Sequence, residues 1–219
     1  MRETKEQKKK RIAKIIILLS KNHGNTMLAR LSHMGAYKSL ISTILSARAR
    51  DETTEVLAKE LFRKYRTMKS LADAPLPQLE KDIKKSGFYK QKARRIKEVS
   101  QIILTKHRGK VPETMEELTA LPGVGRKTAG CVLVYAFGKQ AIPVDTHVHR
   151  ISNRLGLVET KAPEKTEQEL MKLVPKNRWH LVNDLLVNHG KTICNPITPS
   201  CSRCEISKLC PRKKVTRWK

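Results

Sequence analysis

A tight turn, Pro122-Gly123-Val124-Gly125, constrains the fold of this chain more than any other stretch. Residues 115–121 before it have helical periodicity, and residues 126–138 after it read as a second, apolar helix that ends at a glycine. Two helices joined in this way leave backbone N–H groups at the start of the second helix without intrahelical partners. Because the helix dipole adds positive potential there, Gly123 and Gly125 are candidates for binding a phosphate through the backbone.

Two cations, Arg126 and Lys127, occupy the first turn of the second predicted helix. The helix dipole disfavours cations at this end, and such local violations are more common at functional sites than elsewhere. Cationic surroundings would also favour the free amine of Lys127, which is the nucleophilic form. The simpler alternative is that both side chains hold phosphates.

Asp145 stands immediately before a helical segment, residues 146–155, and is expected to act as its N-cap. A capping carboxylate is held ionised and immobile. A fixed carboxylate opposite the amine of Lys127 would form a carboxylate–lysine pair suited to attack on a sugar carbon.

The C-terminal region contains a cysteine cluster with the spacing C-x6-C-x2-C-x5-C, made of Cys194, Cys201, Cys204 and Cys210. Disulfides are rare in intracellular proteins, so the spacing indicates metal ligation. Taken alone, it fits a structural zinc site and an iron–sulfur cluster about equally. Cys131 lies outside the pattern and is expected to be a small buried residue.

The charge balance of the chain is strongly positive, with 46 Lys and Arg against 20 Asp and Glu among 219 residues, a net charge of +26. Such an excess indicates a polyanionic partner, and nucleic acid is the first candidate. Aromatic residues are only 4%, which disfavours single-strand binding by rows of stacked rings and favours duplex binding through phosphates. The charge is spread along the chain, which disfavours a membrane-surface helix. The apolar run Ile15–Leu19 is too short for a signal peptide, so a cytoplasmic protein is expected.

Helical periodicity recurs along the chain and no convincing alternating strand is found, so the predicted fold class is all-α. A loop is expected from about residue 24 to residue 37, Asp51 is expected to cap a helix, and residues 86–89 are expected to form a turn. The expected helices cover residues 3–21, 39–47, the segment after 51, 71–72, 76–83, 91–107, 115–121, 126–138, 146–155, 164–174 and 178–189.

The segment around Lys127, the Asp145 segment and the cysteine spacing together resemble the endonuclease III branch of the helix-hairpin-helix DNA glycosylases. The resemblance extends from about residue 39 to residue 212. It implies that Lys127 forms a Schiff base with deoxyribose C1′ and that Asp145 assists departure of the base. It also implies excision of oxidised pyrimidines, cleavage of the abasic strand by β-elimination, and a 4Fe–4S cluster on the four cysteines.

The same resemblance implies a bilobed protein that binds damaged or abasic double-stranded DNA as a monomer. A six-helix lobe would span residues 29–139 and contain the hairpin. A second lobe, carrying the cluster loop, would combine residues 1–28 with 140–219. Lys127 and Asp145 would then lie on opposite walls of the cleft between the lobes.

Two loops are expected to reach into the DNA duplex, because chemistry at C1′ requires the nucleotide to be rotated out of the helix. Phe88 would be the apolar wedge, with a loop residue packed on the core as the alternative. Arg48 stands where many bacterial relatives carry Gln, and its fork of donors suits the O6/N7 edge of guanine. We therefore hypothesise some preference for G opposite the lesion. Residues 195–200 lack the basic side chains that relatives often have there.

Two other functions are compatible with parts of the sequence. A monofunctional mismatch glycosylase would keep the fold, but such relatives usually lack a lysine at the position of Lys127. A non-catalytic DNA-binding or iron–sulfur redox protein would suit the charge, the hairpin and the cysteines, but it leaves the pairing of Lys127 with Asp145 unexplained.

Overall fold

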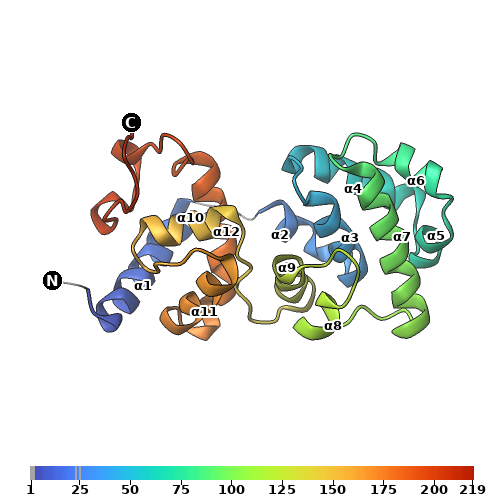
Figure 1. Ribbon diagram of the computed structural model, residues 1–219, viewed down its shortest axis with the longest axis horizontal. Coiled ribbons are helices and arrows are strands. Elements are labelled where there is room, and N and C mark those ends of the chain that lie inside the picture. Colours follow the sequence, from blue (N-terminus) through green and yellow to red (C-terminus); the bar gives the residue numbers. More distant parts are fainter. Residues whose placement is uncertain (1–2, 23, 25) are drawn as a thin grey trace. The chain divides into compact units, whose positions relative to one another are not determined.

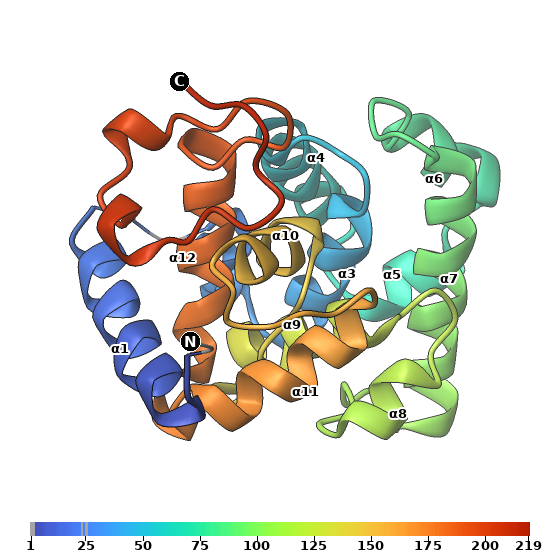
Figure 2. The same ribbon diagram turned by 60° about the vertical axis from the view of Figure 1, so that its left-hand side comes forward.

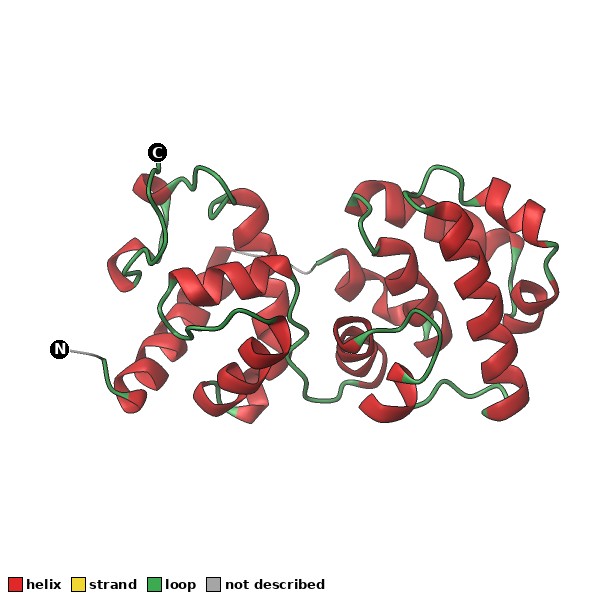
Figure 3. Cartoon of the chain, in the orientation of Figure 1, coloured by secondary structure: helices red, strands yellow, loops and turns green. Residues whose placement is uncertain are grey.

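The computed structural model describes residues 3–22, 24 and 26–219, and every regular element in these ranges is a helix (Figures 1 and 3). The predicted all-α fold is confirmed. None of the helices in the described ranges combines the length and the hydropathy that a transmembrane span requires. In chain order, the helices are α1 (Lys5–Asn22), α2 (Met27–Leu31), η1 (Ser32–Met34), α3 (Ala36–Ser46), α4 (Asp51–Lys64), α5 (Met68–Asp73), α6 (Leu76–Asp82), α7 (Tyr89–Lys106), α8 (Met115–Thr119), α9 (Arg126–Phe137), α10 (Thr146–Arg154), α11 (Pro163–Leu173), η2 (Lys176–Arg178), α12 (Trp179–Thr192), η3 (Cys201–Arg203) and η4 (Ser207–Leu209).

The chain divides into two compact units, one of residues 27–139 and one that combines residues 1–26 with 140–219. In the 27–139 unit, α3 packs against α4 and α9, while α7 packs against α5 and α6. Its interior is apolar and well buried, with fully enclosed side chains that include Leu40, Ile41, Leu45, Leu71, Leu79, Ile83, Ile96, Ile103 and Leu118. These helices position the hairpin and the two loops expected to enter DNA.

The other unit joins the N-terminal helix to the C-terminal half of the chain. Figure 2 shows α1 running beside α12 and α11, and α10 also packs on α12. The apolar stripe of α1, at Ile12, Ile15, Ile16 and Leu19, lies in one core with side chains from α10, α11 and α12. The stripe is therefore part of a folded core, as its helical spacing predicts.

Two local predictions are wrong. The loop expected between residues 24 and 37 contains α2 and η1, because Met27, Leu28 and Leu31 bury themselves in a helix only one turn long. Asp51 is the first residue of α4 and not its cap, since the N-cap position is Arg50, which has extended backbone. In the first turn, Asp51 still complements the positive end of the helix.

Candidate active site and cysteine pocket

The turn between α8 and α9 has the hairpin geometry expected from its glycines. Gly123 adopts a left-handed backbone with φ of +74°, and a Cβ built on it would lie 2.3 Å from Cδ of Arg95 on α7. Val124 is buried and donates its N–H to the carbonyl of Leu121 over 3.1 Å. The left-handed backbone favours glycine at residue 123, whereas the end of the flexible Arg95 side chain could move away from a Cβ.

Gly125 is the N-cap of α9, with an extended backbone and no side-chain cap. A Cβ at this residue would meet open space, so its glycine is not required by packing. The first backbone N–H groups of α9 lie next to Gly125, and the positive end of the helix favours an anion there. The turn thus has the form of a backbone phosphate site, and Gly123 and Gly125 are both exposed.

The two cations predicted at the start of α9 occupy its first two positions. Arg126 is exposed, while Lys127 is half-buried, two residues before the buried stretch that begins at Ala129. The remainder of α9 is packed into the core of the 27–139 unit, where Cys131 is fully buried, as expected for a small apolar residue. α9 therefore holds Lys127 on a rigid element at the unit's surface.

Asp145 is the N-cap of α10, as predicted. Its Oδ1 accepts hydrogen bonds from the backbone N–H groups of His147 and Val148, over 2.8 and 2.9 Å. Both capping bonds use the same oxygen, so Oδ2 takes no part in the cap. Burial lowers the pKa of His147, although the charge of Asp145 acts in the opposite direction. Lys127 and Asp145 belong to different units, and the prediction that they face each other stays a prediction.

The two predicted DNA-entering loops meet at Arg48 and Phe88. The guanidinium carbon of Arg48 lies 5.4 Å from the centroid of the Phe88 ring, within the range of a cation–π contact. Phe88 is 59% exposed, so the alternative that its ring packs on the core is wrong. Both residues have left-handed backbones, with φ of 54° and 59°.

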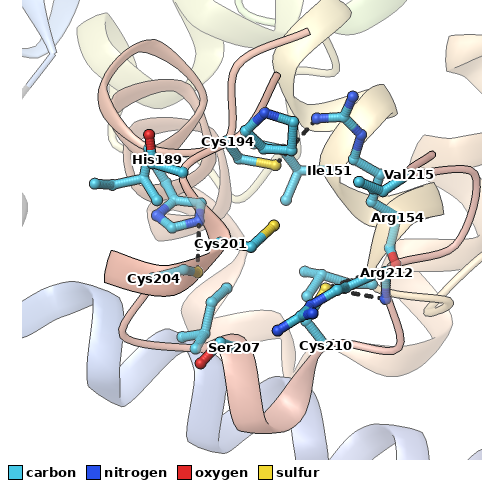
Figure 4. A pocket seen from close by; sticks show the side chains of 15 residues that line it. Ile151, Arg154, His189, Cys194, Cys201, Cys204, Ser207, Cys210, Arg212 and Val215 are labelled. Atoms are coloured by element: carbon cyan, nitrogen blue, oxygen red, sulfur yellow. Dashed lines mark hydrogen bonds between the residues drawn. The ribbon is translucent and has the colours of Figure 1, made fainter. Parts of the chain in front are cut away.

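The four cysteines of the C-terminal motif line a single pocket, shown in Figure 4. Each is half-buried. Among the described residues, no group of three or more His, Cys, Asp and Glu side chains is arranged to hold a metal ion. Burial raises the pKa of the Cys204 thiol to about 11 and moves those of Cys201 and Cys210 in the same direction.

Basic side chains from α10 hold the cysteine loop. Arg154 is only 8% exposed, and its guanidinium donates to Sγ of Cys194 over 3.4 Å and to the carbonyl of Asn195 over 2.6 Å. It also donates to the carbonyl of Pro196. One turn earlier, Arg150 donates to the carbonyl of Cys194 over 2.8 Å. α10 thus carries Asp145 at one end and the anchor of the cysteine loop at the other.

Sequence reasoning missed several residues around these sites. Nε2 of His189, a fully buried side chain, lies 3.7 Å from Sγ of Cys204. Arg150 and Arg154 also contact the cysteine loop. Their four-residue spacing, which places both on one face of a helix, was a sequence signal for a shared role. The sequence offered no signal for Lys92, a buried lysine that lies within a run of basic residues.

Comparisons with a family model and with known proteins agree on the family of this chain. Residues 41–176 match the family described as "HhH-GPD superfamily base excision DNA repair protein". Endonuclease III of Thermotoga maritima is 52% identical over 174 residues, which cover 80% of this chain and 82% of that protein.

Two solved structures are also similar. One is a non-covalent endonuclease III–DNA complex, with a TM-score of 0.86 and 36% sequence identity. The match covers 93% of this chain and 95% of the chain in that structure. The other is a trapped endonuclease III–DNA covalent intermediate in an estranged-adenine complex, with a TM-score of 0.78 and 39% sequence identity. The match covers 81% of this chain and 84% of the chain in that structure. The chain belongs to the endonuclease III family, the bifunctional DNA glycosylases and AP lyases of base excision repair within the HhH-GPD superfamily.

Proposed function

We propose that this chain excises oxidised pyrimidines from double-stranded DNA and cleaves the resulting abasic strand, with Lys127 as the nucleophile and Asp145 as its carboxylate partner. The observation that carries the proposal is the placement of Lys127 in the first turn of α9, beside the Gly123–Gly125 turn. A related protein has been trapped as a covalent intermediate with DNA, which supports a covalent route. The proposed active form is a monomer, in which one chain supplies both reactive groups.

In the first step, the neutral amine of Lys127 attacks C1′ of the damaged nucleotide. The bond from nitrogen to C1′ forms as the glycosidic bond breaks, and the base leaves with the bonding electron pair and is protonated. Asp145 stabilises the positive charge that develops on the sugar or accepts the proton released by the amine. A carboxylate anchored by two backbone N–H groups suits this part, since it needs no reorganisation.

In the second step, the sugar ring opens and the amine is joined to C1′ as an iminium ion. The iminium acidifies the proton on C2′. Loss of that proton moves its electron pair into a new double bond, and the 3′ phosphate leaves. Water then hydrolyses the Schiff base and returns Lys127 to its amine form. This sequence consumes no oxidant, reductant or nucleotide.

Binding to the DNA backbone is assigned to the hairpin and to the general positive charge. The N–H groups beside Gly123 and Gly125 would hold a phosphate, with Arg126 next to it. The net charge of +26 would supply a large part of the affinity and make it strongly salt-dependent. Duplex DNA with damaged bases or abasic sites is therefore the proposed partner.

Arg48 and Phe88 are assigned to the space vacated by the extruded nucleotide. The exposed ring of Phe88 would enter the base stack, and the guanidinium of Arg48 would contact the orphaned base. Because the fork of Arg48 suits the O6/N7 edge, we expect faster reaction opposite G than opposite A.

The four pocket cysteines would hold a 4Fe–4S cluster, for which Cys194, Cys201, Cys204 and Cys210 supply one thiolate each. The buried cation Arg154, with its donor on Cys194, fits a group that carries negative charge. When bound, the cluster would cross-link a loop whose regular elements are the one-turn helices η3 and η4. Arg150 and Arg154 also stabilise this loop, because their hydrogen bonds to its carbonyls attach it to α10.

Borohydride trapping on an abasic duplex tests the proposed chemistry, because reduction converts a Schiff base into a stable adduct. The wild-type chain should give a covalent protein–DNA product, and Lys127→Ala should abolish it. Arg126→Ala is the matched control, since it removes the neighbouring cation and keeps the amine. Affinity for the duplex should fall only moderately in both variants, because each removes one of many cationic contacts.

The alternatives give different results. A monofunctional glycosylase or a non-catalytic DNA-binding protein would yield little adduct with the wild-type chain. An adduct that persists in Lys127→Ala would place the nucleophile elsewhere.

A further inference from the structure

A buried amine connects the two loops that carry Arg48 and Phe88. Lys92, in the first turn of α7, is only 3% exposed. Its Nζ donates to the carbonyl of Leu45 over 2.7 Å and to Oγ of Ser86 over 2.6 Å. One atom therefore joins the end of α3 to the turn that precedes α7.

The bond to Leu45 completes the C-terminus of α3. A helix would normally satisfy this carbonyl with the N–H of Ala49, but that group donates to Ser46 over 3.1 Å instead. The Lys92 amine takes the vacant place, and a cation there complements the negative end of the helix. Removing the amine would leave the carbonyl of Leu45, three residues before Arg48, with only the longer bond of 3.4 Å from the Ser86 hydroxyl.

Beyond these anchors, the chain adopts costly backbone conformations. Arg48 and Phe88 both have left-handed backbones, a conformation that non-glycine residues adopt rarely and that recurs at functional sites. The two loops also touch: a Cβ built on Gly87 would lie 3.3 Å from the carbonyl oxygen of Arg48. The side chains of Arg48 and Phe88 stack at 5.4 Å. Two interactions thus fix the relative position of Arg48 and Phe88. Their side chains stack at the surface, and Lys92 joins the bases of the two loops in the interior.

We propose that Lys92 is a positioning residue that fixes Arg48 and Phe88 as one rigid pair, so that both enter the DNA duplex together. The inference rests on the DNA role proposed for these two residues. Lys92 itself is buried and would not contact DNA. Its effect would appear in how well the protein discriminates the opposite base, which Arg48 would contact.

The experiment compares Lys92→Met with Lys97→Met, measuring affinity for an abasic duplex and single-turnover cleavage opposite G and A. Lys97 is a matched control on the same helix, because it donates to the carbonyls of Ala72 and Ala74 over 2.8 and 2.7 Å, away from both loops. Lys92→Met should slow cleavage about tenfold, as small displacements of positioned groups do, and bring the G-to-A ratio toward one. Lys97→Met should keep the wild-type ratio.

A double-mutant cycle separates positioning from general stability. In a chain that already carries Arg48→Ala and Phe88→Ala, Lys92→Met should have little further effect on DNA affinity, because it has nothing left to position. A merely structural role would give the same loss in both backgrounds, and that result would overturn the inference. So would a Lys92→Met chain whose G-to-A ratio equals that of Lys97→Met.

Gly87→Ala provides a second route if Lys92→Met does not fold. Its Cβ forces the Arg48 carbonyl to shift by a few tenths of an ångström, so it disturbs the pair and leaves the amine in place. We expect the G-to-A ratio to fall, and an unchanged ratio would contradict the inference. If Arg48→Ala and Phe88→Ala alone leave affinity and ratio unchanged, the proposed DNA role itself fails, which is a different outcome.

Discussion

Oδ1 of Asp145 accepts the backbone N–H of Val148 over 2.9 Å, so the carboxylate assigned to the chemistry also starts α10. The two roles can be separated, because asparagine caps a helix about as well as aspartate but has no charge. Asp145→Asn should melt close to the wild-type temperature and still lose at least about tenfold in single-turnover base excision, as expected for removal of a catalytic proton acceptor.

Asp145→Ala is the companion variant, since it removes cap and charge together. It should lower the free energy of unfolding by about 1 kcal/mol in addition to the kinetic loss. Thermal melting and single-turnover excision measure the two effects. An Asp145→Asn chain with wild-type kinetics would show that Asp145 serves only as a cap.

The two glycines of the hairpin should respond differently to alanine. Gly123→Ala places a Cβ in a left-handed conformation, so it should cost about 1–2 kcal/mol of unfolding free energy, while the flexible Arg95 side chain moves away from the new Cβ. Gly125→Ala meets open space and should cost only roughly 0.5 kcal/mol, the difference between glycine and alanine as a cap. Chemical denaturation measures both, and equal losses would contradict this account of the turn.

Retention of the proposed cluster should depend on the planar fork of Arg154. Arg154→Lys keeps the charge but cannot reach Cys194 and the neighbouring carbonyls in the same geometry. Loss of such an outer contact typically lowers metal affinity about 10- to 100-fold, so iron should be released at least about tenfold faster. The readout is iron and sulfide per chain over time. Arg203→Lys, an exposed change between two of the cysteines, should release iron at the wild-type rate.

The buried amine of Lys92 predicts a pH dependence of stability. Burial lowers its pKa from 10.5 to about 8 in the folded chain. Between these values the folded state has lost the proton while the unfolded state keeps it, so stability rises with pH. Below pH 8 both states are protonated and the cost of burying the charge is present in full. The stability of the wild type relative to Lys92→Met should therefore increase by about 3 kcal/mol from pH 8 to pH 10.5.

Denaturant midpoints at a series of pH values measure this difference. Groups that titrate in both proteins cancel in the comparison, and Lys97→Met serves again as the control. A difference that stays constant over this range would mean that the Lys92 amine keeps its proton in the folded state.

The elements that were predictable from the sequence are those whose signal is local. The cap at Asp145, the turn at Gly123 and the end of α9 at Gly138 follow from residue type and helical spacing, and the structure has all three. The one-turn helix α2 was not predictable, because a single turn contains too few residues to display a period.

Contacts between distant segments were beyond the reach of the sequence. Arg48 and Phe88 were each assigned to a loop, but their stacking and their left-handed backbones depend on how α3 and α7 pack. Lys92 is one of several neighbouring cations, and only the fold shows that it alone among them points inward to Leu45. The partners of Arg154 on the cysteine loop are likewise set by packing.

The unit that contains Asp145 and the cysteine pocket takes its first helix from one end of the chain and its remaining helices from the other. During translation, α1 leaves the ribosome long before α11 and α12 exist, so Ile12 and Ile16 have no core to enter. The intervening unit has all its helices available earlier and can fold first. Until then the apolar face of nascent α1 lacks its native partners, and the proposed catalytic carboxylate reaches its final setting only after α12 has been synthesised.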